Sequence, residues 1–197
     1  MDIASFLTSL NKFDLLVVLA GFGFFVLRFI QGTIRRVLGL ASMLFSFLFA
    51  ANLRDSLGAY LAVNWNQFPD EYAVMLGFGI VFTAATIAFT LIIQGFYHKQ
   101  ALFKKATVAD ELIGGFLGIV QALLLVGSVI VILDSFFRLS GIPRSDGELP
   151  WIRSLFDTMN TSGTADIFRT RLIPGFISVF GLLIPNDIKS LYIFVSS

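Results

Sequence analysis

Cysteine is absent from the 197-residue chain, which excludes disulfide bonds, a thiolate nucleophile and thiolate metal ligands. The single histidine, His98, follows an apolar run and precedes Lys99, so we interpret it as a solvated loop residue; one histidine without cysteine does not make a typical zinc site. The net charge of +1 gives no overall field that would attract nucleic acid. We therefore expect no metal, no cofactor and no nucleic-acid partner.

Charge is also scarce: only 14% of the residues are charged, against about 25% in a soluble domain. Hydrophobic residues make up 56% of the chain, 23 of them phenylalanine, and the mean hydropathy is +0.85. This composition predicts an all-α integral membrane protein with four transmembrane helices and additional short interfacial helices. The four expected spans cover residues 13–30, 37–53, 72–95 and 112–133.

The segments outside these spans predict a second region. Residues 1–12 have apolar side chains at helical spacing, which favours a short interfacial helix over a cleaved signal peptide. Residues 54–71 are expected to form a loop that contains a short helix on the membrane surface. Four prolines interrupt residues 139–197, and the apolar piece 172–184 is too short to span, which indicates an amphipathic or re-entrant segment. We accordingly divide the chain into a four-span region, 1–138, and a C-terminal region, 139–197.

Polar residues inside the expected spans are few and lie at helical spacing. In the third span they share one face, which consists of Thr83, Thr86, Thr90 and Gln94. Threonine hydroxyls can bond the carbonyl four residues earlier, so this face is more often structural than conductive. Gln121 lies near the middle of the fourth span, where its amide needs a partner, and the threonine face is one candidate.

Asp14 and Arg28 limit the first span to about 20 Å of uncharged helix. They either mark the two ends of the span, or one of them faces a partner within the bundle. Paired ionisable groups at mid-span, which an intramembrane enzyme requires, are absent from spans two to four of the sequence. We therefore expect no enzyme.

Basic residues are concentrated in alternate loops, which predicts the orientation. The first and third turns are basic, with Arg28, Arg35, Arg36, Lys99, Lys104 and Lys105. The middle loop has one basic residue, Arg54, and three acids. We expect the basic turns in the cytoplasm and both termini outside, which is an N-out, C-out topology. Five of these residues (Arg35, Arg36, Lys99, Lys104 and Lys105) could also form a patch for anionic headgroups, although topology alone explains them.

Two stretches resemble the CvpA family, the colicin V production proteins. The first is Asp14 followed by I-Q-G-T-I-R-R-V-L at residues 30–38, which contains Gly32, Arg35 and Arg36. The second is D-E-L-I-G-G-F-L-G-I-V-Q-A at residues 110–122, with Asp110, Gly114 and Gly118, followed by an apolar run that ends near Asp134. Gly114 and Gly118 also form a GxxxG pair, which is typical of close helix contacts. The resemblance covers roughly residues 13–134.

The chain departs from the family pattern at Gln31 and Gln121, where arginine is usual, and at Glu111 and Ala122. The two glutamines are expected to be neighbours at one end of a helix pair. The resemblance implies a bacterial inner-membrane protein with a role in colicin V production or export, or in envelope homeostasis. In some relatives this domain anchors a periplasmic serine protease, but no Ser/His/Asp set is recognisable in this sequence.

Two functions follow as hypotheses. The first is a non-enzymatic membrane scaffold whose partners are the lipid bilayer and other envelope proteins. The alternative is a channel or transporter subunit, lined by the threonine face and Gln121, which would need a homo-oligomer because four helices enclose little lumen.

Overall fold

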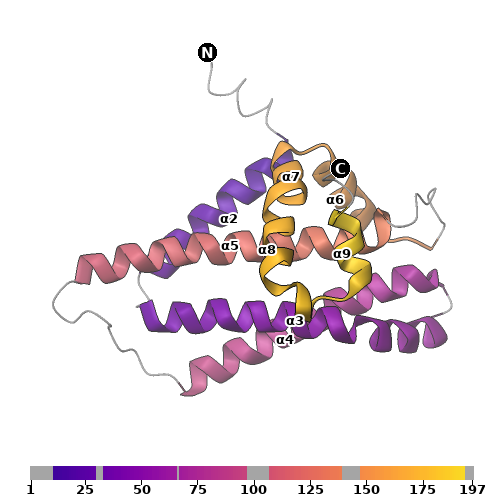
Figure 1. The fold of residues 1–197 in the computed structure, drawn as a ribbon, viewed down its shortest axis with the longest axis horizontal. Coiled ribbons are helices and arrows are strands. Elements are labelled where there is room, and N and C mark those ends of the chain that lie inside the picture. The colour runs from indigo at the N-terminus through magenta and orange to yellow at the C-terminus, as the bar shows by residue number, and fades with distance from the viewer. Residues whose placement is uncertain (1–10, 30–32, 66, 97–106, 139–146, 194–197) are drawn as a thin grey trace, which may run out of the picture.

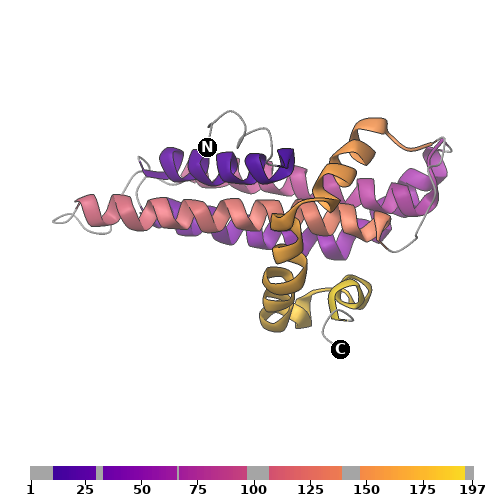
Figure 2. The ribbon, with the colours of Figure 1, turned by 90° about the horizontal axis from the view of Figure 1, so that it is seen from above.

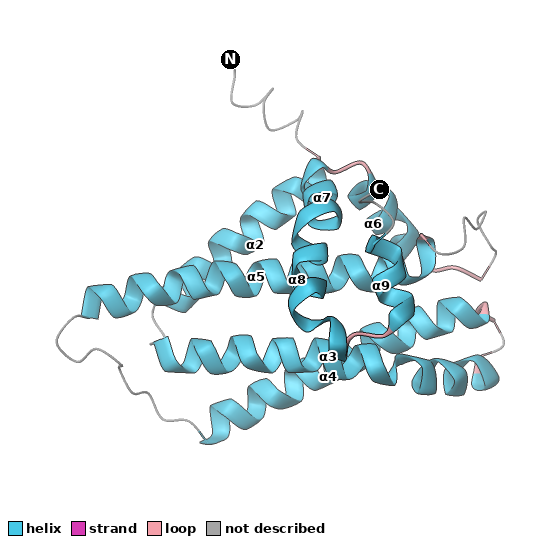
Figure 3. Ribbon diagram, in the orientation of Figure 1, coloured by secondary structure: helices cyan, strands magenta, loops and turns pink. Residues whose placement is uncertain are grey.

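The computed structural model describes residues 11–29, 33–65, 67–96, 107–138 and 147–193. All regular structure in these ranges is helical, which confirms the all-α prediction (Figure 3). Four long helices come first: α2 (Lys12–Phe29), α3 (Thr33–Asn64), α4 (Asp70–Phe96) and α5 (Thr107–Phe137). The interfacial helix expected within residues 1–12 lies almost wholly outside the described residues.

Three of the long helices, α3, α4 and α5, are long and apolar enough to cross a membrane. Helix α2 has 18 residues, three of which are charged, and is not among them. The described part of the chain thus supports a multi-span helical protein, while the count of four spans stays a prediction.

The expected loop after the second span was wrong. Helix α3 continues through Arg54 and Asp55 to Asn64, and its 32 residues extend over about 48 Å. Arg54 does not end the helix because its side chain is buried against the C-terminal segment. The helix then passes Gly58, where α4 approaches so closely that a Cβ would meet Val74. The last turns of α3 are therefore stabilised by contact with α4.

The four helices pack in the spatial order α2, α5, α3, α4, with further contacts between α4 and α5 (Figure 1). Small residues permit the close contacts, as is usual between helices in lipid. The ring of Phe25 on α2 lies against Gly115 on α5, and Gly77 on α4 lies against the backbone of Gly58 on α3. On the outward sides, large apolar side chains such as Phe22 and Ile87 are exposed, as a lipid-facing surface requires.

Residues 147–193, called the tail from here on, form six short helical elements. These are α6 (Pro150–Asn160), α7 (Gly163–Ile167), η1 (Phe168–Leu172), α8 (Ile173–Phe180), η2 (Gly181–Leu183) and α9 (Asn186–Ile193). Figure 2 shows α6 on one side of the long helices and α8 and α9 on the other. The tail therefore wraps around the end of α5.

Residues 172–184 were expected to form an amphipathic or re-entrant segment too short to span, and the structure has the short elements α8 and η2 there. Their position relative to a membrane stays a prediction. Pro174 does not break the helix because the turn before it, η1, is a π-helix. In this turn the amide of Ile173 donates to the carbonyl of Phe168, five residues back. A π-turn adds a residue to the helical turn and so relieves the clash that a proline ring normally causes.

A chain of aromatic rings joins the tail to the long helices. Tyr72 on α4 meets Phe136 on α5 at 5.1 Å between ring centroids, and Phe137 stacks on Phe156 of α6 at 4.5 Å. The Arg153 guanidinium lies over the Phe137 ring at 4.5 Å and is held by Glu148 through two hydrogen bonds of 2.7 Å. The tail and the long helices consequently share one hydrophobic core.

Candidate functional site

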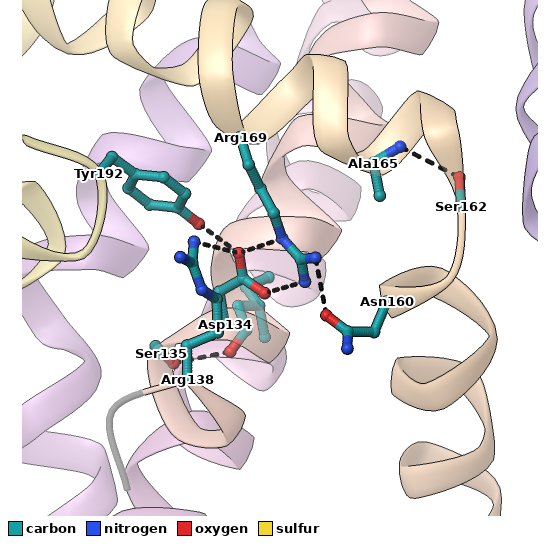
Figure 4. A network of polar contacts seen from close by, with 9 residues as sticks. Asp134, Ser135, Arg138, Asn160, Ser162, Ala165, Arg169 and Tyr192 are labelled. Carbon is teal, nitrogen blue, oxygen red and sulfur yellow. Dashed lines mark hydrogen bonds and ion pairs between the residues drawn. The ribbon is translucent and has the colours of Figure 1, made fainter. Parts of the chain in front are cut away.

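The main polar cluster surrounds Asp134, which is fully buried near the end of α5 (Figure 4). Arg169 of η1 donates twice to this carboxylate, from Nε to Oδ2 at 2.9 Å and from Nη2 to Oδ1 at 2.6 Å. The Tyr192 hydroxyl of α9 donates to Oδ2 at 2.9 Å, and Nη1 of Arg138 lies 3.7 Å from the same oxygen. A two-point arginine–carboxylate pair is among the strongest charge-assisted contacts in proteins. Asp134 thus holds two separate parts of the tail.

The two arginines of the cluster make further contacts. Nη1 of Arg169 donates to Oδ1 of Asn160 at 2.9 Å, and its guanidinium lies 5.9 Å from the Phe156 ring centroid. The Arg138 guanidinium lies 5.7 Å from the Tyr192 ring centroid, so each arginine has an aromatic neighbour. With its carboxylate neutralised and hydrogen-bonded, the cluster has the form of a satisfied structural network.

Tyr192 lies in α9, outside the long helices. Burial raises the pKa of its hydroxyl well above the ordinary value, and the negative charge of Asp134 raises it further. The hydroxyl is therefore a proton donor to Asp134 throughout the physiological range. It carries no negative charge that could act as a base.

A second contact links the tail to α2 through Asp14. Oδ1 of Asp14 accepts from the Ser162 hydroxyl at 2.5 Å and from the amide of Thr164 at 3.1 Å. Ser162 is the N-cap of α7, and its hydroxyl oxygen accepts from the amide of Ala165 at 3.1 Å. Asp14 and Ser162 together satisfy amides at this helix start that would otherwise be unpaired. Asp14 lies in the first turn of α2 and also faces a partner, which is the tail, so the two interpretations given above do not exclude one another.

A third contact links the tail to α3. The buried Arg54 forms an ion pair with Asp187 of α9 and also lies 3.5 Å from Asp55. Its guanidinium lies 5.8 Å from the Phe78 ring centroid, and the neighbouring Asn52 donates to the carbonyl of Leu183 at 3.0 Å. Each of α2, α3 and α5 therefore binds the tail through one charged residue.

At the other end of the long helices, Arg36 of α3 is almost completely buried against α5. Its Nη1 donates to the carbonyls of Asp110 and Glu111, both at 3.4 Å. The guanidinium occupies the space that a Cβ at Gly114 would fill. The lack of a side chain at Gly114 therefore makes room for the Arg36 side chain of α3. This explains the glycine more specifically than close packing of two helix backbones does.

The buried charges form two levels. Arg36 and Arg54 are 18 residues apart on α3, about 27 Å along the helix. Asp110 and Asp134 are 24 residues apart on α5, about 36 Å. The hydrocarbon core of a bilayer is about 30 Å thick, so these spacings match the distance between its two boundaries.

The other predicted residues are placed as follows. Gly118 is buried on α5. Arg35 lies in α3 and Gln94 in α4, but their side chains are outside the described residues, as are Gly32, Gln31, His98, Lys99, Lys104 and Lys105. The expectation that Gln31 and Gln121 lie close together therefore stays a prediction. The same holds for the five-residue basic patch.

The expected polar face is only partly buried. Thr83 and Thr90 are exposed on α4, while Gln121 is buried on α5. The hydroxyl of Thr86 is buried and has no hydrogen-bond partner among the described residues. Thr83 lines an open groove between α4, α5 and α6 whose other lining residues are almost all apolar.

Sequence reasoning missed the tail's contribution to the site. Arg169, Tyr192 and Asp187 were not among the predicted site residues. Ser162, followed by Gly-Thr-Ala-Asp, carries a weak helix-start signal, but nothing nearby in the sequence links it to Asp14. Among the described residues, no group of three or more His, Cys, Asp or Glu could hold a metal ion.

Long apolar helices with buried charges near both ends define a multi-pass membrane protein. The family model described as colicin V production protein matches residues 13–165, most of the chain. The chain belongs to the colicin V production protein family. No curated protein and no solved structure matches it. The family match begins beside Asp14 and ends inside α7, so it includes the start of the tail.

Proposed function

We propose that this protein is a non-catalytic membrane scaffold of the bacterial envelope. The observation that carries the proposal is the attachment of the tail to three long helices through Asp14, Arg54 and Asp134. Such fixed attachment presents a rigid surface at one membrane boundary. A rigid surface suits recruitment because little conformational entropy is lost when a partner binds.

The tail also offers residues for contact. Trp151 of α6 is 65% exposed and Ile167 is 52% exposed. Aromatic residues of this kind are enriched where proteins bind one another. By the family's role, the recruited partners belong to colicin V production or export, or to envelope homeostasis.

The proposed location is the inner membrane, with both termini and the tail on the periplasmic side. This placement follows from the basic turns of the sequence. The tail would then meet periplasmic proteins or the exposed parts of other membrane proteins. A second copy of the chain is one candidate partner.

Photo-crosslinking in native membranes tests the scaffold. A photoreactive phenylalanine analogue replaces Trp151, and a matched control replaces Phe22, which is 67% exposed on α2. We expect a discrete protein adduct from the tail position and lipid adducts from the control position. Equal protein adducts at both positions, or none from the tail, would contradict the proposal.

The alternative, an oligomeric channel or transporter subunit, is favoured by one observation: the hydroxyl of Thr86 is buried and has no hydrogen-bond partner in the part of the chain that the structure describes. Purified protein in liposomes decides between the two. The scaffold predicts solute and ion flux no greater than in protein-free vesicles. Flux that Thr86→Leu or Gln121→Leu abolishes would establish the channel instead.

A further inference from the structure

An open groove of about 650 Å³ lies between α3 and the turn that connects α8 to α9. One wall is apolar and belongs to α3, with Phe45, Leu48 and Phe49. The opposite wall is the turn at residues 182–185, and the rim is polar, with Asn52, Asn186 and Lys189. The groove therefore has an apolar part and a polar part, as the binding site of an amphiphile requires.

Along α3 the groove wall changes from apolar to polar toward Arg54, as a bilayer changes from its acyl chains to its headgroups. Phe45 and Phe49 lie within the apolar stretch of α3 and are 54% and 43% exposed. Asn52 comes two residues before Arg54, which marks the charged boundary of the long helices. Leu182, at the tip of the turn, is 99% exposed, so the wall beside the boundary is apolar too. Surfaces of this kind at this depth face acyl chains.

The charge at the rim is positive. Lys189 is the one charged residue among the described residues that line the groove, and Arg54, Asp55 and Asp187 form an ion-paired cluster outside the lining. Nζ of Lys189 donates to the carbonyl of Gly181 at 3.1 Å, which uses one of its three donors. Nδ2 of Asn52 donates to the carbonyls of Leu48 and Leu183, and the side chain of Asn186 is exposed.

We propose that this groove binds one phospholipid with an anionic headgroup. One acyl chain lies along Phe45 and Phe49, the phosphate contacts Lys189, and the exposed leucines of the turn lie among neighbouring acyl chains. In the topology proposed above, the lipid belongs to the periplasmic leaflet of the inner membrane. The groove is of the size that ligand sites commonly have.

Native mass spectrometry of the full chain, purified with mild detergent and mixed with phosphatidylglycerol or phosphatidylethanolamine, tests the site. We expect one phosphatidylglycerol per chain, at least five-fold preferred over phosphatidylethanolamine. Lys189→Gln abolishes the preference and Lys189→Arg keeps it. Arg171→Gln, an exposed tail cation that does not line the groove, is the matched control and leaves the preference unchanged. Equal binding of both lipids by the unchanged chain, or an unchanged preference in Lys189→Gln, overturns the proposal.

A second measurement leaves Lys189 intact. Leu182→Cys can be labelled with an environment-sensitive fluorophore because the chain has no other cysteine. In vesicles, spin-labelled phosphatidylglycerol should quench this fluorophore more than the same label on phosphatidylcholine. A label at Leu16→Cys, 50% exposed on α2, should be quenched equally by both lipids. Emission typical of water at position 182, or a dimer that occupies the groove without lipid, would also overturn the site.

Discussion

The carboxylate of Asp134 on α5 receives two hydrogen bonds from Arg169, 35 residues later in the tail, at 2.9 and 2.6 Å. Asp134 is fully buried and the Arg169 side chain is 11% exposed. Removing one partner of such a pair leaves a buried charge without compensation, whereas replacing both can be close to neutral. A single substitution at either residue should therefore weaken the attachment of the tail to α5.

We expect Asp134→Ala to destabilise the folded protein by about 3 kcal/mol and to speed tryptic cleavage after Arg171. Combining it with Arg169→Leu should cost clearly less than the sum of the two single changes, since no buried charge is then left alone. Thermal unfolding in detergent and limited proteolysis provide the measurements. Asp157→Asn, an exposed acid of α6, is the control and should change neither. Strict additivity would show that the two side chains do not act as a pair.

A second prediction concerns the opposite end of the long helices. Gly114→Ala places a Cβ where the Arg36 guanidinium lies, so the guanidinium must leave the carbonyls of Asp110 and Glu111. We expect a loss of about 1–3 kcal/mol in the free energy of unfolding. Gly23→Ala on α2, with nothing within 4 Å of the new Cβ, should be nearly neutral.

The same change made in an Arg36→Ala background isolates the cause. If the guanidinium is the obstacle, Gly114→Ala costs little once the arginine is gone. An unchanged cost in that background would place the clash elsewhere on α5.

A third prediction concerns pH. The pKa of Tyr192 is raised in the folded state by burial and by Asp134, while in the unfolded chain it is about 10. Its contribution to stability is therefore complete below pH 10 and falls as the pH rises above that value, where only the unfolded chain ionises. Alkaline unfolding followed by tyrosinate absorbance should show this loss. Tyr192→Phe should be less stable by about 1 kcal/mol at neutral pH and should lose less on going to alkaline pH. If the stability of the unchanged protein and of Tyr192→Phe fell equally with rising pH, Tyr192 would not be the source of the alkaline loss.

A fourth prediction concerns topology, and the absence of cysteine makes it simple to test. Val63→Cys lies near the end of α3 at a position that is 77% exposed, and Leu102→Cys lies between α4 and α5 in the sequence. In intact cells with a permeable outer membrane, an impermeant thiol reagent should label the first and not the second. Labelling of Leu102→Cys from outside would reverse the proposed orientation.

The sequence alone determined the class of this protein. Its apolar composition, its long uncharged runs and the motifs at residues 30–38 and 110–122 led to an all-helical membrane protein and to its family, because hydrophobic length and local spacing are sequence properties. It also placed Asp14 and Asp134 at the ends of apolar runs, and the two residues lie in the first turn of α2 and the last turn of α5.

Only the tertiary structure decided what those residues contact. Asp14 and Ser162 are 148 residues apart, and Arg54 and Asp187 are separated by most of the chain, so no local pattern could pair them. The extension of α3 beyond Arg54 has the same origin, since a charge that usually ends an apolar helix is here buried by an ion pair from α9. Local spacing specifies helices, but the pairing of distant charges depends on how those helices pack.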